Sequence, residues 1–341
     1  MNPRHLILAS VTILTIFVAG AVASYRALFS EIDLLSADTS SGLAPVKIEV
    51  VAGSSLSRVA AELGEAGYLP SPALFKLWAR LQGAENNIQT GEYELQAGIT
   101  PAQLLDKIVR GESVQYRITL VEGWTFQQAL DALWNTENIR SSLINNSPAE
   151  IAEKMSLDYE NPEGLLYPDT YFYTKGTLDI ELLLRANERL NTLLSESWES
   201  RLGALPYANP YEALTMASII EKESARNSER ALIAAVFVGR LDLGMRLQSD
   251  PTTIYGMGDR YAGNIRRADL LEETPYNTYR ISGMPPTPIA LSGEASILAA
   301  LNPAASDYLY FVARGDGSHQ FSHSLEEHNA AVREYQLGPN E

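Results

Sequence analysis

The stretch "SIIEKESARNSER", residues 218–230, places two acids after an apolar dipeptide in a segment that is typical of a helix. At about 100° per residue, Glu223 shares one arc of this helix with three large apolar residues, Met216, Ile219 and Ile220. Burial in such an arc would disfavour the ionised carboxyl and raise its pKa, which is what a general acid needs. Glu221 lies about 160° away on the same wheel. The alternative is that this helix end is solvated and that both acids are surface charges.

Two segments downstream of this helix are rich in Gly, Pro and short polar side chains, residues 244–258 ("GMRLQSDPTTIYGMG") and 276–289 ("YNTYRISGMPPTPI"). Loops of this kind often carry function on a rigid scaffold, and hydrogen-bonding groups beside flat aromatic faces suit sugars. The alternative is turn chemistry, with Asp250-Pro251 starting a turn. The candidate sugar contacts are Gln248, Ser249, Asp250, Thr252, Thr253, Tyr276, Asn277, Thr278 and Tyr279.

The composition excludes several classes of function. The 341 residues carry a formal net charge of −16, whereas binding of nucleic acid depends on Lys and Arg, so a neutral or zwitterionic substrate fits better. The absence of Cys excludes disulfides, iron–sulfur clusters, thiolate zinc sites and cysteine nucleophiles. Three histidines near the C-terminus and Asp316 match no helical metal motif, so no metal or cofactor is expected. The histidines, His319, His323 and His328, are predicted to have structural roles or to contact glycan.

The N-terminus indicates where the chain resides. Arg4 precedes an uncharged stretch, residues 6–24, which would span about 28 Å as a helix and is predicted to cross a bilayer. The position of Arg4 predicts that residues 1–5 are cytoplasmic and that the chain after the span is exported. The rival interpretation is a signal peptide, because Ala21-x-Ala23 is a cleavage pattern. Residues 25–45 are polar and Ser-rich, and they are predicted to be a linker.

The exported part is predicted to be α+β with two domains. Residues 46–112 read as a strand, two helices and a strand, followed by a third helix, which resembles a LysM module, a fold that grips cell-wall glycan. The alternative for this module is a spacer that binds nothing. Residues 113–336 form the larger mixed domain and residues 337–341 a tail. Within the larger domain, the aromatic-rich residues 163–177 are predicted to form a buried hairpin.

Long collinear motifs across this chain closely resemble one known family, the MltG (YceG-like) endolytic murein transglycosylases. The resemblance runs from about residue 46 to residue 335. It departs from the family at Arg246, where Pro is common, and at Thr287, where Gly is common. The motifs are "LVEGW" (120–124), "EGLLYPDTY" (163–171), "ALTMASIIEKES" (213–224), "VFVGRLDLGMRLQSDPTTIYG" (236–256), "YNTYRISGMPPTPI" (276–289) and "YLYFVARGDGSHQFSHSLEEHNAAV" (308–332).

The resemblance implies chemistry with one carboxyl group, carried by Glu223 as the second acid of "IEKE". Glu223 would protonate the oxygen between N-acetylmuramic acid (MurNAc) and N-acetylglucosamine (GlcNAc). It would then take the proton from the C6 hydroxyl of MurNAc as that oxygen closes on C1, leaving a 1,6-anhydro end that terminates strand growth. Hydrolases instead use a second carboxylate, and Asp250 is the best candidate for that role. By motif match, Gln248, Asp250, Thr252, Tyr276, Asn277 and Tyr279 are predicted to bind the substrate.

The resemblance also implies a location and partners. The chain would cross the inner (cytoplasmic) membrane once, with its catalytic domain in the periplasm and peptidoglycan strands as its substrate. Wall-synthesis complexes with penicillin-binding proteins are the implied protein partners. Two alternatives stay open: a peptidoglycan-binding scaffold without catalysis, and a muramidase that uses water.

Overall fold

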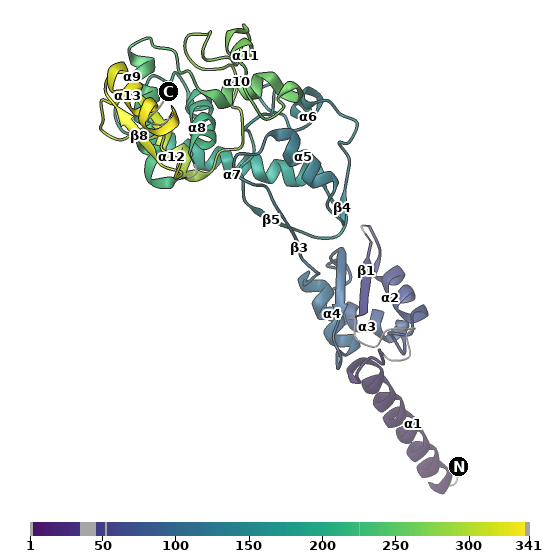
Figure 1. Cartoon of the computed structure of the whole chain (residues 1–341). Helices are drawn as coiled ribbons and strands as arrows, with labels where there is room; N and C mark the ends of the chain where they lie inside the picture. The colour runs from purple at the N-terminus through teal and green to yellow at the C-terminus, as the bar shows by residue number, and fades with distance from the viewer. Residues whose placement is uncertain (1–2, 35–45, 52, 225, 338–341) are drawn as a thin grey trace. The chain divides into compact units, whose positions relative to one another are not determined.

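The computed structural model describes residues 3–34, 46–51, 53–224 and 226–337 (Figure 1). The predicted α+β class is confirmed, with helices as the larger part. The chain divides into two compact units. Unit 1 holds the chain up to Tyr116 together with Phe172–Gly176, and unit 2 holds Arg117–Tyr171 and the chain from Thr177 onward.

The N-terminal helix α1, Pro3–Phe29, continues past the predicted end of the span at Ser24. Its segment Ser10–Phe29 is long and apolar enough to cross a membrane, by length and composition. The last turn of α1 belongs to unit 1, because Leu28 is buried and the backbone N–H of Ile32 donates to Ile99 O at 2.8 Å. Part of the predicted linker is therefore helix, and its residues 35–45 lie outside the described residues.

Unit 1 is built on two antiparallel strands, with Val46 opposite Leu95 and Val50 opposite Gly91. Hydroxyl side chains cap all three of its other helices: Ser55, Ser71 and Thr100 each accept a backbone N–H from the first turn. Phe75, Tyr93 and Leu104 are fully buried between strands and helices. The order strand–helix–helix–strand is the predicted one, and the likeness to a LysM module stays a prediction. The elements are β1 (Val46–Val50), α2 (Leu56–Glu65), α3 (Pro72–Leu81), β2 (Gly91–Leu95) and α4 (Pro101–Arg110).

Unit 2 is mostly helical, and its strands are short. Within the described residues, β3 pairs with β5, β4 pairs with β6 in parallel and β7 pairs with β8 antiparallel. A 3-10 helix, Gly258–Arg260, and a π-helix, Arg333–Leu337, complete it. Two of the strands also have residues in unit 1, β3 with Tyr116 and β5 with Phe172 and Tyr173. The elements are β3 (Tyr116–Thr119), α5 (Phe126–Trp134), β4 (Ile139–Arg140), α6 (Pro148–Lys154), β5 (Thr170–Tyr173), β6 (Thr177–Leu178), α7 (Asp179–Glu199), α8 (Pro210–Glu223), α9 (Asn227–Asp242), α10 (Asp250–Met257), α11 (Arg267–Leu271), α12 (Glu294–Leu301), β7 (Tyr310–Ala313), β8 (His319–Ser322) and α13 (Leu325–Val332).

Helix α8 forms the centre of unit 2 and packs against α7, α9, α10 and α12 (Figure 1). Every residue from Ala213 to Ile220 is buried, because apolar and small side chains occupy all faces of this stretch. Asn209 caps the helix by accepting the N–H of Glu212, and Pro210 occupies the first turn, where its missing N–H costs nothing. Asn209 and Pro210 therefore define where α8 begins. Its last residue, Glu223, is followed by the next loop.

The predicted hairpin at residues 163–177 is wrong in its pairing. Strands β5 and β6 lie in this region, but each pairs with a strand from earlier in the chain rather than with the other. The predicted burial is present, since Glu163, Leu166 and Tyr171 are all buried. Gly164 allows this segment to pass close to Pro288, which lies in the motif 276–289. The φ of Gly164 is +75°, and an added Cβ would lie 2.3 Å from Pro288 Cβ.

Gly164 and Gly203 offer a matched test of this close approach. Both have nearly the same left-handed φ, +75° and +73°, but an added Cβ at Gly203 meets nothing within 4 Å. We expect Gly203→Ala to lose only the strain of a left-handed alanine, about 1–2 kcal/mol of unfolding free energy. Gly164→Ala should lose clearly more, because overpacking against Pro288 adds about 1–3 kcal/mol. Chemical denaturation of both variants measures the difference, and equal losses would show that the contact with Pro288 is not tight.

Candidate active site

Glu223 is the last residue of α8, and its carboxyl enters a cavity of about 470 Å³ in unit 2. The apolar neighbours expected from the helical wheel, Met216, Ile219 and Ile220, are fully buried. Burial, opposed by the hydrogen bond from Ser249 and aided by the Asp250 charge, raises the pKa of the Glu223 carboxyl to about 7, and the Arg240 charge opposes the shift slightly. At neutral pH a large share of Glu223 therefore holds a transferable proton.

Ser249 fixes one oxygen of the Glu223 carboxyl. Ser249 Oγ donates a hydrogen bond to Glu223 Oε1 at 2.5 Å, and Ser249 is itself buried. Thr278 holds Ser249 in turn, because the Ser249 N–H donates to Thr278 Oγ1 at 2.9 Å. Oε1 is the oxygen that accepts, so the proton of the neutral acid is left to Oε2.

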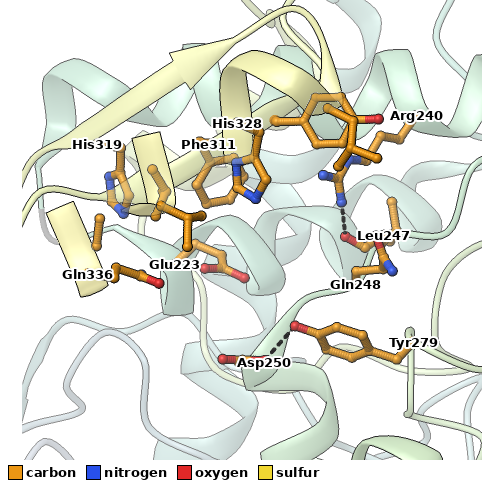
Figure 2. Close-up of a pocket in the computed structure, with 15 residues that line it drawn as sticks. Glu223, Arg240, Leu247, Gln248, Asp250, Tyr279, Phe311, His319, His328 and Gln336 are labelled. Atoms are coloured by element: carbon orange, nitrogen blue, oxygen red, sulfur yellow. Dashed lines mark hydrogen bonds between the residues drawn. The ribbon is translucent and has the colours of Figure 1, made fainter. Parts of the chain in front are cut away.

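The cavity is lined by segments that lie far apart in the sequence. Figure 2 shows the Glu223 carboxyl between Asp250 and Tyr279 on one side and Phe311 and His328 on the other. Aromatic rings and hydrogen-bonding groups alternate along its wall, a combination that suits a carbohydrate. The lining residues are Glu223, Arg240, Leu247, Gln248, Asp250, Tyr279, Tyr310, Phe311, Val312, Ala313, His319, Leu325, His328, Val332 and Gln336.

Three of the six predicted substrate-binding residues line this cavity together with Glu223: Gln248, Asp250 and Tyr279. Tyr279 Oη donates to Asp250 Oδ1 at 2.7 Å, which orients both groups. Gln248 has a left-handed backbone, with φ at +52°, and its N–H donates to Thr278 O at 3.2 Å. The predicted loop is shorter than expected, because Asp250 already begins helix α10.

The other three predicted residues do not line the cavity; they order the loops around it. Thr252 is fully buried, and its Oγ1 donates to Ser249 O at 2.8 Å. Asn277 is also buried; its amide donates to three backbone carbonyls, and its Oδ1 accepts the N–H of Tyr279 at 3.1 Å. Tyr276 Oη shares a hydrogen bond with Thr287 Oγ1 at 2.9 Å. Their role as substrate contacts stays a prediction.

Glu221, the first acid of the pair, is held inside the protein by an ion pair and a hydrogen bond. It forms an ion pair with Arg230 at 3.0 Å, with only 5% of its own side chain and 6% of the Arg230 side chain exposed. Its other oxygen accepts the N–H of Gly293 at 3.0 Å. The alternative that both acids are solvated surface charges is therefore wrong. Glu221 joins α8 to the start of α9 and α12.

Arg240 lines the cavity, although nothing in its sequence context indicated it. Only 7% exposed, it donates from Nε to Leu309 O at 2.7 Å and from Nη1 to Leu247 O at 2.6 Å. Its guanidinium also lies over the Tyr310 ring, 5.2 Å from the ring centre. In the sequence, Arg240 is a basic residue close behind the apolar run 231–238 of α9.

Glu163 is a second buried acid that the sequence reasoning passed over, although it opens the motif "EGLLYPDTY". It accepts hydrogen bonds from the N–H groups of Phe126 and Gly164 and from Tyr255 Oη. Burial raises the pKa of Glu163 to about 7. Glu163 does not line the cavity; it joins the start of α5 to α10.

The histidines have separate partners. His319 Nδ1 lies 2.7 Å from Glu229 Oε2, and His323 Nδ1 lies 2.9 Å from Asp307 Oδ1. The His328 ring stacks on Tyr310, with ring centres 5.3 Å apart. In the part of the chain that the structure describes, no group of three or more His, Cys, Asp or Glu side chains is arranged to hold a metal ion.

Comparison with known proteins places this geometry in a family. A sequence model of the YceG-like family matches residues 48–334. A relative from Bacillus subtilis (strain 168), named endolytic murein transglycosylase, is 31% identical over 313 residues, which cover 87% of this chain and 86% of that protein. A protein of the same name from Streptococcus pneumoniae serotype 2 (strain D39) is 27% identical, covering 85% of this chain but only 58% of that protein.

A solved structure supports the same assignment. The crystal structure of a YceG-like protein from Listeria monocytogenes aligns with a TM-score of 0.51 and 30% identity, covering 84% of this chain and 98% of that one. This chain belongs to the YceG-like family.

The two acids of α8 should respond differently to the loss of their charge. Glu221→Gln leaves the buried guanidinium of Arg230 without its counter-ion, and removing one partner of a buried pair costs about 3–5 kcal/mol of unfolding free energy. Glu223→Gln resembles the neutral acid that burial already favours, so its loss of stability should be small. Thermal and chemical denaturation at pH 7 measure both. Equal stability of the two variants would contradict the structural role of Glu221.

Proposed function

We propose that this chain cuts nascent peptidoglycan strands internally, between MurNAc and GlcNAc, with Glu223 as the acid and a 1,6-anhydroMurNAc end as the product. The lytic transglycosylase class itself follows from the family and from relatives named endolytic murein transglycosylase. The observation that carries the proposal is the Glu223 carboxyl: a group with a pKa raised to about 7, held at the end of a buried helix and directed into a cavity.

The proposed reaction moves one proton out of Glu223 and one proton back. Glu223 donates its proton to the glycosidic oxygen, the C1–O bond of MurNAc breaks and GlcNAc leaves with a hydroxyl group. Positive charge develops at C1 and the ring oxygen. The C6 hydroxyl oxygen of the same MurNAc then bonds to C1, and its proton passes to the Glu223 carboxylate. No water is consumed, and the enzyme returns to its starting state.

An internal nucleophile explains how one carboxyl can suffice. Glycoside hydrolases need a second carboxylate, either to attack C1 or to activate water. A hydroxyl on the substrate itself is already close and gains from proximity. Asp250 is the carboxylate in the same cavity that would serve a water-using enzyme, but its Oδ1 accepts a hydrogen bond from Tyr279. We assign Asp250, Gln248 and Tyr279 to substrate positioning.

Ser249 has a positioning role in this mechanism. Its hydroxyl donates to Oε1, so the acidic proton resides on Oε2, and one orientation of the acid is selected before substrate binds. The same hydrogen bond stabilises the carboxylate that forms after proton donation. Ser249 therefore makes Glu223 a somewhat stronger acid, whereas the neighbouring Asp250 charge makes it a weaker one.

The location and the smaller module complete the proposal. The apolar helix Ser10–Phe29 serves as an uncleaved single-pass anchor in the cytoplasmic membrane, with unit 2 on the periplasmic side. The β1–α2–α3–β2 module acts as a LysM-like unit that holds glycan, with penicillin-binding proteins as partners in wall synthesis. These assignments rest on the order of elements and on the family resemblance.

Glu223→Gln should abolish glycan cleavage, because an amide keeps the shape of the acid but has no proton to transfer. Mass spectrometry of digested, uncrosslinked glycan strands measures the outcome. The unmodified enzyme should leave 1,6-anhydroMurNAc ends and the variant none, with the fold unchanged by circular dichroism. Glu221→Gln is the matched control: assayed below its unfolding temperature, it should still make anhydro ends.

The same experiment separates the competing functions. Reducing ends in place of anhydro ends would identify a muramidase that uses water. Intact strands with the unmodified protein would identify a glycan-binding scaffold. Either result overturns the transglycosylase proposal.

The pH dependence of kcat/KM should show a single limb that falls as pH rises through about 7, because only protonated Glu223 can start the reaction. Ser249→Ala removes a hydrogen bond that lowers this pKa, so the limb should move to higher pH. Asp250→Asn removes a negative charge that raises the pKa, so the limb should move to lower pH.

These opposite shifts distinguish electrostatic effects on Glu223 from damage to the fold. Unfolding would lower activity without moving the limb in opposite directions. Ser249→Thr keeps the hydroxyl and should restore the original limb. A bell-shaped pH profile whose low-pH limb disappears in Asp250→Asn would contradict the mechanism. It would indicate a second catalytic carboxylate.

A further inference from the structure

Unit 1 exposes an apolar patch where α1 ends, which we call the α3 patch. It comprises Leu77, Trp78 and Leu81 of α3 with Tyr25 and Phe29 of α1. Exposed fractions are 52% for Leu77, 72% for Leu81 and 65% for Tyr25. Large apolar side chains so exposed, and next to one another, usually mark an interaction surface.

Ring contacts make the patch continuous from one helix to the other. The Tyr25 and Phe29 rings stack with centres 5.0 Å apart, and the Phe29 ring meets the Trp78 ring edge-on at 5.4 Å. On α3, Leu81 follows both Leu77 and Trp78 by one turn, so Leu81 lies beside the indole and beside Leu77. The opposite side of α3 is occupied, since Phe75 and Ala79 are fully buried in the core of unit 1.

The position of the patch along α1 defines what can cover it. The candidate span Ser10–Phe29 has 20 residues, about 30 Å of helix, which matches the apolar thickness of a bilayer. Phe29 therefore marks the level at which the span leaves the bilayer. Trp78, in contact with Phe29, lies close to that level, and Trp and Tyr are the residues favoured at membrane interfaces.

The end of α1 and the residues that directly follow it pack on the core of unit 1. Leu28 is buried, and Ile32 belongs to the apolar core of unit 1 together with Phe75. The N–H of Ile32 also donates to Ile99 O at 2.8 Å. Because the end of α1 and helix α3 pack on the same core, a bilayer that surrounds α1 also reaches the exposed leucines of α3.

We propose that the α3 patch inserts into the outer boundary of the same bilayer that α1 spans, so that unit 1 has a second, monotopic contact with lipid. The proposal rests on the anchor assigned under the proposed function. Lipid fits better than glycan, since the large exposed side chains that α3 contributes to the patch, Leu77 and Leu81, are apolar, whereas a sugar needs hydrogen-bonding groups. Arg26 and Lys76, adjacent in sequence to Tyr25 and Leu77, are basic and suit anionic headgroups.

The absence of cysteine makes a direct test possible, because a single introduced Cys takes a nitroxide label at one site only. Leu81 of α3 and Leu202 of unit 2 are a matched pair, with exposed fractions of 72% and 71%. Leu81→Cys and Leu202→Cys are labelled in the full chain and placed in phosphatidylethanolamine–phosphatidylglycerol nanodiscs. Electron paramagnetic resonance then compares collisions with oxygen, which is concentrated in lipid, and with a water-soluble nickel chelate.

At position 81 we expect oxygen collisions to exceed nickel collisions several-fold relative to position 202, with Leu77→Cys repeating the result. Equal, water-like values at positions 81 and 202 would overturn the proposal. Dipolar broadening between two labelled chains in one disc would instead assign the patch to a second copy and overturn it as well. Protection from nickel without oxygen contact, gained only on adding glycan strands, would assign it to glycan.

A separate measurement distinguishes failure of this proposal from failure of the anchor. The intact mass of the purified chain reports whether Met1 is retained, and elution with nanodiscs reports insertion. A chain beginning at Ser24 with water-like labels would overturn both the anchor and the patch. A full-length, inserted chain with water-like labels would overturn the patch alone. Anhydro ends produced by the same labelled samples report the catalytic activity independently.

Discussion

The burial of the middle of helix α8, residues 213–220, is the constraint on which unit 2 depends. A helix with apolar neighbours on every side must satisfy its polar side chains inside the protein. Ser218 Oγ accepts the N–H of Ile289, Glu221 takes the N–H of Gly293 and Glu223 takes the hydroxyl of Ser249. These hydrogen bonds draw two segments onto the helix, the one that precedes α12, with Ile289 and Gly293, and the one that precedes α10, with Ser249. The loops that surround the cavity are therefore placed by the same requirement that keeps α8 stable.

The sequence predicted the apolar helix face beside Glu223 better than it predicted the loops around this residue. Periodicity alone placed Glu223 beside Met216 and Ile220, because the neighbours in question lie on the same helix. The environment of Glu221 depends on Gly293, which lies 72 residues away, and no local pattern reports such a contact. Arg240 was missed as a lining residue for the same reason, since the cavity assembles from helices and strands that are distant in the sequence.

Membership of a sequence motif did not predict which side chains face the cavity. Thr252 and Asn277 lie in the strongest motifs, yet both are buried and bonded to backbone groups, because sharply turning loops need internal hydrogen-bond partners. The two departures from the family pattern make contacts of the same kind. Arg246 Nη1 donates to Tyr279 O at 3.1 Å, and Thr287 Oγ1 pairs with Tyr276 Oη. Arg246 and Thr287 thus give side-chain supports to two tyrosines of the segment 276–289.

The direct packing of α1 into unit 1 has a consequence for how such an enzyme meets its substrate. A protein on a long flexible tether samples a hemisphere of solution, and its effective concentration near any point falls steeply with tether length. Here Leu28 and Ile32 hold the end of α1 directly on unit 1. With α1 in a membrane, unit 1 diffuses in two dimensions at a fixed height. Its encounters are then governed by lateral density in the membrane rather than by volume concentration, and strands that emerge from the same surface are favoured over glycan farther away.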